Sequence, residues 1–229
     1  WKNAKDDAPK AQLKGRNEDH TRFLNTIMVP TGKLAGDNIT VSELMPYKAG
    51  NCPNGTAQFE KRGVAADVPV WTAENCIQCN QCAYVCPHAV IRPFAMTEAE
   101  AKGVEGALPF TGNKDLKFTL AISALDCTGC GSCAQVCPSK TKALKMVPVE
   151  TELVNAEQKK YDKLFKSVSI KPEVAGPKNV KASQFLQPLM EFSGACPGCG
   201  ETPYAKLMTQ LFGDRMFVAN ATGCSSIWG

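Results

Sequence analysis

The sequence predicts an α+β protein, and three observations support this fold class. Two cysteine-rich loops of matching sequence each lie between short apolar runs that read as strands. Residues 150–167 have the composition of a long helix, and residues 202–213 have the signals of a second one. The four apolar runs are 68–71, 90–92, 118–122 and 143–146.

Eight of the twelve cysteines form two runs with the same spacing, C-x2-C-x2-C-x3-C-P, and the second run begins 51 residues after the first. This spacing is typical of a bacterial-type ferredoxin with two [4Fe–4S] clusters. Three cysteines of each run bind one cluster and the fourth binds the other. The first predicted ligand set is Cys76, Cys79, Cys82 and Cys137, and the second is Cys127, Cys130, Cys133 and Cys86.

Composition excludes several other classes of protein. Zinc sites seldom use two such runs, and a disulfide framework belongs to small secreted domains. The sequence has no secretory signal and no apolar run of membrane-spanning length. The net charge of +4 is small and forms no basic stripe, so nucleic acid is not an expected partner. Thiolate-bound clusters favour a reducing compartment, and we expect a cytoplasmic protein.

The N-terminal part reads as a linker followed by short helices. Residues 1–18 are polar and charged. A helix is expected over residues 20–28, ending before Pro30. Residues 40–44 should form a short helix with Thr40 or Ser42 as its N-cap.

The central part reads as two strand–loop–helix–strand halves. We expect the runs at 68–71 and 118–122 to pair with each other. Residues 93–117 form an insertion between the halves, with a helix over 97–102 that begins in a Thr97/Glu100 capping box.

After the second half, the helix at 150–167 and a linker at 171–178 precede a segment of different composition. In that segment a helix follows Thr202, which should be its N-cap, and residues 216–220 read as a buried strand. The expected buried positions of the first helix are Leu153, Tyr161, Leu164 and Phe165. The predicted divisions are a linker and N-terminal extension (1–70), a ferredoxin-like domain (71–150), a helix and linker (151–181) and the start of another domain (182–229).

A third set of cysteines, Cys196-x2-Cys199 and Cys224, is ambiguous by itself. Such a set can be a redox dithiol, part of a zinc site or part of an iron–sulfur site, and no fourth ligand is left nearby. Cys52 reads as a structural or free thiol. His88 follows Cys86-Pro87, where a surface histidine is the favoured interpretation over a residue that tunes a cluster.

These residues together resemble the C-terminal half of the pyruvate:ferredoxin (flavodoxin) oxidoreductase family. The similar segments are GTAQFEKRG at 55–63, the first cysteine run at 76–93, and the GACPGCGETPY and ATGCSSIWG segments near the end. The resemblance covers residues 20–229. It implies that residues 182–229 begin an α/β domain that binds thiamine diphosphate.

The resemblance also implies an activity, cofactors and partners. The full enzyme would oxidise a 2-oxo acid with thiamine diphosphate, Mg²⁺, coenzyme A and three [4Fe–4S] clusters, and pass electrons to ferredoxin or flavodoxin as a homodimer. Cys196, Cys199 and Cys224 would bind the third cluster, with a fourth ligand outside this chain. Cys224 and Glu201 would lie beside thiamine diphosphate, and the less favoured alternative for Glu201 is a solvated carboxylate in the first turn of a helix.

Several features of that family are absent from this sequence. It has no GDG-type segment for Mg²⁺ and diphosphate, and no substrate or coenzyme A domain. We therefore expect a fragment of a longer polypeptide that does not turn over alone, with the other domains of the same enzyme as partners. The alternative is a non-enzymatic polyferredoxin-type carrier in which the third cysteine set is a zinc site or a dithiol.

Overall fold

The computed structural model describes residues 15, 17–221 and 223–228. Most of the polar segment expected as a linker at 1–18, and Thr222 of the last motif, lie outside the described residues. The chain divides into two compact units.

The first unit comprises residues 1–60, and its described part is helical. One continuous helical segment consists of α1 (Glu18–Phe23), a π-helical turn (Leu24–Met28) and α2 (Val29–Gly32). The expectation that this helix ends before Pro30 is wrong. Pro30 lies directly after the π turn, at the start of α2, and the helical segment continues past it to Gly32.

The rest of this unit consists of short turns around one more helix. Helix α3 (Val41–Leu44) begins at Thr40, which forms a capping box with Glu43, so the predicted short helix is confirmed. Phe23 and Tyr47 pack edge to face with their ring centroids 4.9 Å apart. Single 3₁₀ turns cover Gly36–Asn38, Met45–Tyr47 and Ala57–Phe59.

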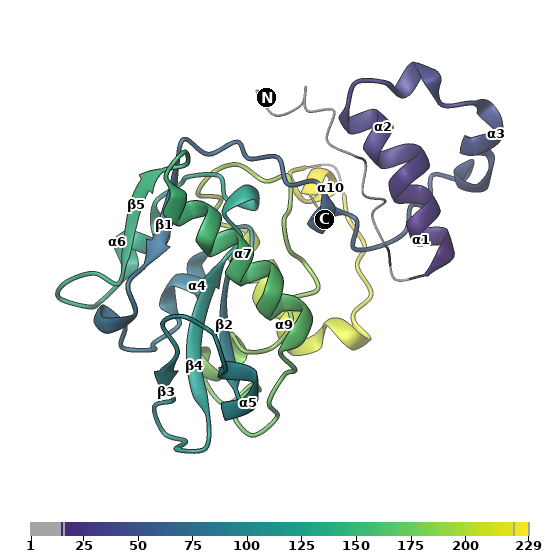
Figure 1. Ribbon diagram of the computed structural model, residues 1–229. Coiled ribbons are helices and arrows are strands. Elements are labelled where there is room, and N and C mark those ends of the chain that lie inside the picture. Colours follow the sequence, from purple (N-terminus) through teal and green to yellow (C-terminus); the bar gives the residue numbers. More distant parts are fainter. Residues whose placement is uncertain (1–14, 16, 222, 229) are drawn as a thin grey trace. The chain divides into compact units, whose positions relative to one another are not determined.

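The second unit, residues 61–229, contains two antiparallel sheets (Figure 1). Strand β1 (Asp67–Trp71) pairs with β5 (Leu144–Pro148). In the other sheet β4 (Lys117–Ile122) lies between β2 (Ile91–Met96) and β3 (Leu108–Pro109). The helices and small sheets give the mixed α+β class that the sequence predicts.

The expected pairing of residues 68–71 with 118–122 is wrong. Strand β1 pairs with β5, and β4 pairs with β2 with Ile122 opposite Ile91. In each pair, one strand leads into a cysteine loop and the other follows the cysteine loop of the opposite half. The two halves therefore exchange strands, which brings both loops to the same part of the domain.

Short helices follow the two cysteine loops, and another lies in the insertion between the halves. Helices α4 (Gln81–Val85) and α6 (Ser132–Val136) come directly after the first cysteines of each run and contact each other. Helix α5 (Glu98–Ala101) begins at a capping box between Thr97 and Glu100, as the sequence predicts. The expected insertion at 93–117 is shorter than predicted, because both of its ends belong to β2 and β4.

Helix α7 (Glu152–Ser167) contacts both sheets through β1 and β4 (Figure 1). Tyr161 and Leu164 are buried as predicted, but Leu153 is 56% exposed and Val154 is buried in its place. The buried positions follow a helical phase that starts at Val154, and Leu153 lies outside it.

The C-terminal part is less regular than the sequence predicts. Helix α9 (Thr202–Phe212) has Glu201 and not Thr202 as its N-cap, and residues 216–220 form no strand. A buried strand needs a partner strand and a covering layer, and Phe217 is fully exposed. The other elements are α8 (Val180–Ser183), a 3₁₀ turn (Gly213–Arg215) and α10 (Ser225–Trp228).

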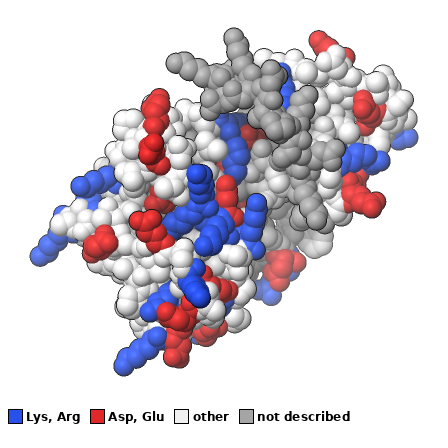
Figure 2. Space-filling view, viewed as in Figure 1, with Lys and Arg blue, Asp and Glu red and all other residues white. Residues whose placement is uncertain are grey.

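The expected domain boundary between residues 70 and 71 cuts through β1, so this strand belongs with the second unit. The boundaries expected at 150 and 181 lie within that unit and stay predictions. Figure 2 shows basic and acidic side chains interspersed over the face in view. Among the described residues, no helix has both the length and the apolar character to cross a bilayer.

The phase of α7 can be tested by two leucine truncations. Leu164→Ala should lower the free energy of unfolding by about 2–5 kcal/mol, because it removes a buried side chain. Leu153→Ala should change it by less than about 0.5 kcal/mol, because Leu153 is exposed. Denaturant unfolding of both variants measures this, and equal losses would contradict the helix phase.

Candidate iron–sulfur sites

Four cysteines from both halves of the domain surround a first cavity. Cys76 and Cys79 lie on the loop after β1, and Cys82 lies on α4. Cys137, the C-cap of α6, comes from the other half. All four cysteines line the cavity, a hollow of about 350 Å³ that includes space open to solvent.

A second cavity has the same construction with the halves exchanged. Cys127 and Cys130 lie on the loop after β4, and Cys133 lies on α6. Cys86, the C-cap of α4, comes from the first half. These four cysteines line a space of about 330 Å³. The structure thus groups the eight cysteines into the two sets that the sequence predicts, and their role as iron ligands stays a prediction.

The backbone of each cysteine loop turns through left-handed conformations at equivalent positions. These are Gln78 and Asn80 in the first loop and Gly129 and Gly131 in the second. Glycine is required at 129, because a Cβ there would lie 3.0 Å from the carbonyl oxygen of Asp67. In the first loop tertiary contacts hold the strained backbone, since the Gln78 amide donates to the Pro109 carbonyl at 2.7 Å.

This backbone shape directs N–H groups at the sulfur atoms. The N–H of Gln78 donates to Sγ of Cys76, and that of Gly129 donates to Sγ of Cys127, both at 3.4 Å. Hydrogen bonds to sulfur are one of the factors that set the reduction potential of an iron–sulfur cluster. The two loops therefore offer the same pattern of donors to whatever each cavity holds.

Burial makes the free thiols hard to ionise. It raises the pKa of Cys127 to about 12, and it raises the pKa values of Cys76, Cys82 and Cys133. Four thiolates in one cavity need a group of positive metal centres to offset their charge. A cysteine set of this kind is the donor set of a [4Fe–4S] cluster.

The sulfur atoms do not converge on a single point. No three His, Cys, Asp or Glu side chains within the described part of the chain could hold one metal ion. Instead, each set of four cysteines lines its own cavity. All twelve cysteines are free of disulfide bonds. Four cysteines free of disulfide bonds in each cavity are a donor set that fits an iron–sulfur cluster.

The loop with Cys196 and Cys199 lies against the second cavity. A methyl group added at Gly198 would lie 3.6 Å from Cβ of Cys130, which is ordinary van der Waals contact. A short bridge fixes the approach of this loop, because the N–H of Phe192 donates to the carbonyl of His88 at 2.9 Å.

His88 is 3% exposed, so the interpretation as a surface histidine is wrong. Its Nδ1 lies 3.0 Å from the carbonyl oxygen of Ser193. Burial lowers the pKa of His88, while the carbonyls of Ser193 and Cys196 act in the opposite direction. His88 thus ties the second cavity to the third cysteine set, a contact across more than a hundred residues that no local pattern signals.

The third set is not assembled like the other two. The pKa of Cys199 is lowered because the backbone N–H groups of Thr202 and Glu201, at the start of α9, donate to its sulfur. Cys196 and Cys224 are exposed, and the described residues do not bring these three cysteines together around one metal ion. The side chain of Glu201 is exposed and makes no capping hydrogen bond.

Cys52 is exposed and forms no disulfide bond. Of the two expectations for it, a free thiol agrees with this environment. It lies in the first unit and lines neither of the two cysteine cavities.

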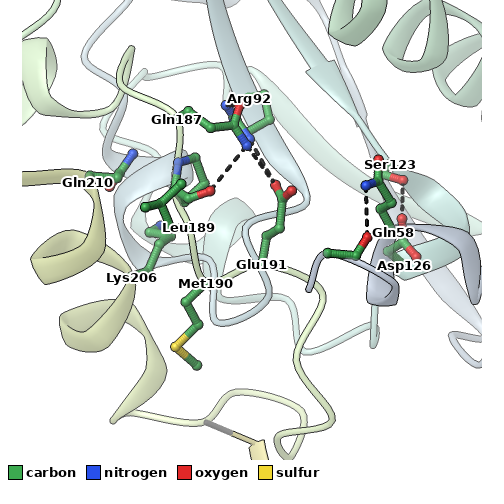
Figure 3. Close-up of polar contacts among 12 residues, drawn as sticks. Gln58, Arg92, Ser123, Asp126, Gln187, Leu189, Met190, Glu191, Lys206 and Gln210 are labelled. Carbon is green, nitrogen blue, oxygen red and sulfur yellow. Dashed lines mark hydrogen bonds and ion pairs between the residues drawn. The ribbon is translucent and has the colours of Figure 1, made fainter. Parts of the chain in front are cut away.

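Three charged residues support the cavities, and sequence reasoning did not identify them. Lys61 forms an ion pair with Asp126, the residue before Cys127. Arg92 on β2 bonds Gln187 and Glu191 at 2.9 and 3.1 Å (Figure 3). The first contact holds the residue before the second cysteine run, and the second ties residues 187–191 to β2.

The third is Lys206 on α9, whose ammonium donates to backbone carbonyls of α4. Burial lowers the pKa of Lys206 to about 8. Lysines are common on protein surfaces, so only its contacts in the folded chain distinguish this one.

The glycine at 129 gives a specific prediction for the second cavity. Gly129→Ala should reduce the bound iron by roughly half, because the new Cβ meets the Asp67 carbonyl and distorts one of two cluster loops. Gly112→Ala is the matched control, because Gly112 also has a positive φ but no heavy atom within 4 Å of an added Cβ. Iron and sulfide analysis of both variants measures the effect, and equal iron contents would contradict it.

Comparisons with known proteins agree with this arrangement. Residues 75–141 match the family described as a 4Fe-4S dicluster domain, and residues 10–65 match a domain of unknown function. The chain is 52% identical over 90% of its length to a pyruvate-flavodoxin oxidoreductase of Enterobacter agglomerans. It is 51% identical over 92% of its length to a pyruvate:ferredoxin oxidoreductase of Moorella thermoacetica.

A third relative has a different name. The chain is 44% identical over 92% of its length to a pyruvate dehydrogenase [NADP(+)] of Cryptosporidium parvum. The chain spans 18% of the length of the first two relatives and 11% of the third. The chain corresponds to a segment of these relatives and belongs to the family of the pyruvate-flavodoxin and pyruvate:ferredoxin oxidoreductases.

Proposed function

We propose that this chain is the electron-transfer segment of a 2-oxo acid oxidoreductase, with pyruvate as the substrate of the full enzyme. The observation that carries the proposal is the pair of cavities, each lined by four cysteines drawn from both cysteine runs. The names of the relatives supply the substrate class, and the chain spans only a small share of their length. The alternative function, a non-enzymatic polyferredoxin-type carrier, is not favoured, because these relatives are named as oxidoreductases.

The task of this chain's residues is to hold and tune the clusters. When bound, two [4Fe–4S] clusters would accept and release single electrons. The N–H groups of Gln78 and Gly129 would favour the reduced state by donating to sulfur. The protein supplies orientation and electrostatics, while the redox chemistry is that of the cofactor.

The order of electron transfer follows from which parts of the chain are in contact. Gly198, between Cys196 and Cys199, lies near Cys130 of the second cavity, since a Cβ added at Gly198 would lie 3.6 Å from Cβ of Cys130. Electron transfer slows steeply with distance, so the second cavity would receive electrons from the side of the third cysteine set. The first cavity would then pass them to the external acceptor.

We propose that Cys196, Cys199 and Cys224 bind a third [4Fe–4S] cluster whose fourth ligand comes from outside this chain. The low pKa of Cys199 supports this, because a thiolate and not a thiol binds metal. Glu201 and Cys224 would face thiamine diphosphate, at the beginning of an α/β domain that binds this cofactor. Mg²⁺ and coenzyme A would be bound by other parts of the full enzyme.

The acceptor of the electrons would be a ferredoxin or a flavodoxin, as the names of two relatives indicate. A relative named for NADP(+) shares 44% identity with this chain, so the acceptor depends on parts of the protein beyond this segment. We further propose that the full enzyme is a cytoplasmic homodimer.

Metal analysis of the full-length protein tests the cluster assignment. Protein purified without oxygen should contain about twelve irons per chain, and reduction should give three interacting EPR signals, one for each of three cubanes. About eight irons with one zinc would contradict the third cluster. Fewer irons than two cubanes require would contradict the whole proposal.

A cysteine variant tests the place of the third set. Cys199→Ala should abolish reduction of the remaining clusters by pyruvate and coenzyme A, while dithionite still reduces them. Cys52→Ala is the matched control, because Cys52 lines neither cavity, and it should behave as the wild type. Normal reduction of the Cys199 variant by pyruvate would refute the proposed relay.

A further inference from the structure

Lys206 is a buried lysine with an unusual set of contacts. It lies on α9, well outside the ferredoxin-like part of the chain, and is only 2% exposed. Its ammonium donates to the backbone carbonyls of Ala83, of Tyr84 at 2.9 Å and of Cys86 at 3.4 Å. An ammonium has three N–H donors and no acceptor, so three carbonyl partners match its charged form.

The carbonyls that Lys206 contacts belong to the end of α4. The last carbonyls of a helix have no partner within the helix and carry partial negative charge. A lysine at this position satisfies them and interacts favourably with the helix dipole. The cap comes from a residue 120 or more positions later in the sequence.

Helix α4 serves both cavities. Cys82 lies within it and lines the first cavity, and Cys86 is its C-cap and lines the second. A shift of α4 would therefore displace one cysteine of each set. Lys206 contacts the backbone of Cys86 itself.

The charge of Lys206 is not offset by a carboxylate in the described part of the chain. Its contacts there are the three carbonyls, and it takes part in none of the ion pairs found there. The neighbouring cation Arg92, by contrast, pairs with Glu191 at 3.1 Å (Figure 3). A buried charge acts more strongly on its surroundings than an exposed one, because the local dielectric constant is lower.

We propose that Lys206 is a positioning residue of the iron–sulfur relay, which fixes α4 between the two cavities and whose positive charge favours the reduced state of the clusters there. This inference rests on the proposed function, because it requires clusters in both cavities. A cluster gains negative charge on reduction, and nearby charge is one of the determinants of its potential. The start of α9 would thereby be coupled to the clusters through one side chain.

Redox titration of the full-length protein, followed by EPR, tests the charge. Lys206→Gln removes the charge and keeps N–H donors for the carbonyls. At a fixed solution potential it should lower the ratio of reduced to oxidised cluster about ten-fold, which is a midpoint about 59 mV more negative. Lys206→Arg keeps the charge and should stay near the wild type. Lys159→Gln, at an exposed position on α7, is the matched control and should leave the midpoint unchanged.

Iron and sulfide contents distinguish a failure of the proposed function from a failure of the role of Lys206. Wild-type protein without clusters would refute the proposed function. If Lys206→Gln has its full clusters and an unchanged midpoint potential, the role proposed for Lys206 is overturned, while the proposed function is not. If Lys206→Gln loses its clusters, retention of clusters by Lys206→Arg supports the positioning role, and loss in both variants overturns it.

Discussion

Each cysteine cavity is completed by one residue from the other half of the domain, and this exchange constrains the rest of the second unit. Cys86 and Cys137 are the C-caps of α4 and α6, and each leaves its helix to line the opposite cavity. The strands follow the same rule, since β1 pairs with β5 and β4 pairs with β2. Neither half can therefore form its cavity alone. A cluster bound in either cavity would link both halves, so that cluster binding and folding of this domain should be coupled.

Residues outside the two halves stabilise short segments next to the cysteine cavities. A helix of five residues such as α4 has little stability of its own, because most of its carbonyls lack partners within the helix. Lys206 supplies those partners from α9, and His88 connects the end of the same loop to Ser193. On the other side, Lys61 holds Asp126 next to the second cysteine run. The segment after residue 180 is thus part of the support of the clusters in addition to carrying the third cysteine set.

The features that local sequence patterns encode could be predicted from the sequence. The grouping of the eight cysteines follows from their spacing, and the capping boxes at Thr40 and Thr97 follow from residues three positions apart. Features that depend on contacts between distant segments could not be predicted in this way. The apolar sequence of a strand does not specify its partner strand, so the predicted pairing of β1 with β4 is wrong. Residues 216–220 are apolar enough for a strand but lie beside no other strand among the described residues. The burial of His88 depends on a segment that begins a hundred residues later.

The exchange of cysteines between cavities is tested most directly by two double variants, studied by EPR on the reduced protein. Cys79→Ala/Cys137→Ala removes two cysteines of the first cavity, and Cys79→Ala/Cys86→Ala removes one from each cavity. We expect the first variant to lose the signal of one cluster and to retain the other cluster of the pair as in the wild type. The second variant should perturb both. The opposite pattern, with two clusters perturbed in the first variant and one in the second, would show that each run binds its own cluster and would contradict the exchange of cysteines between the cavities.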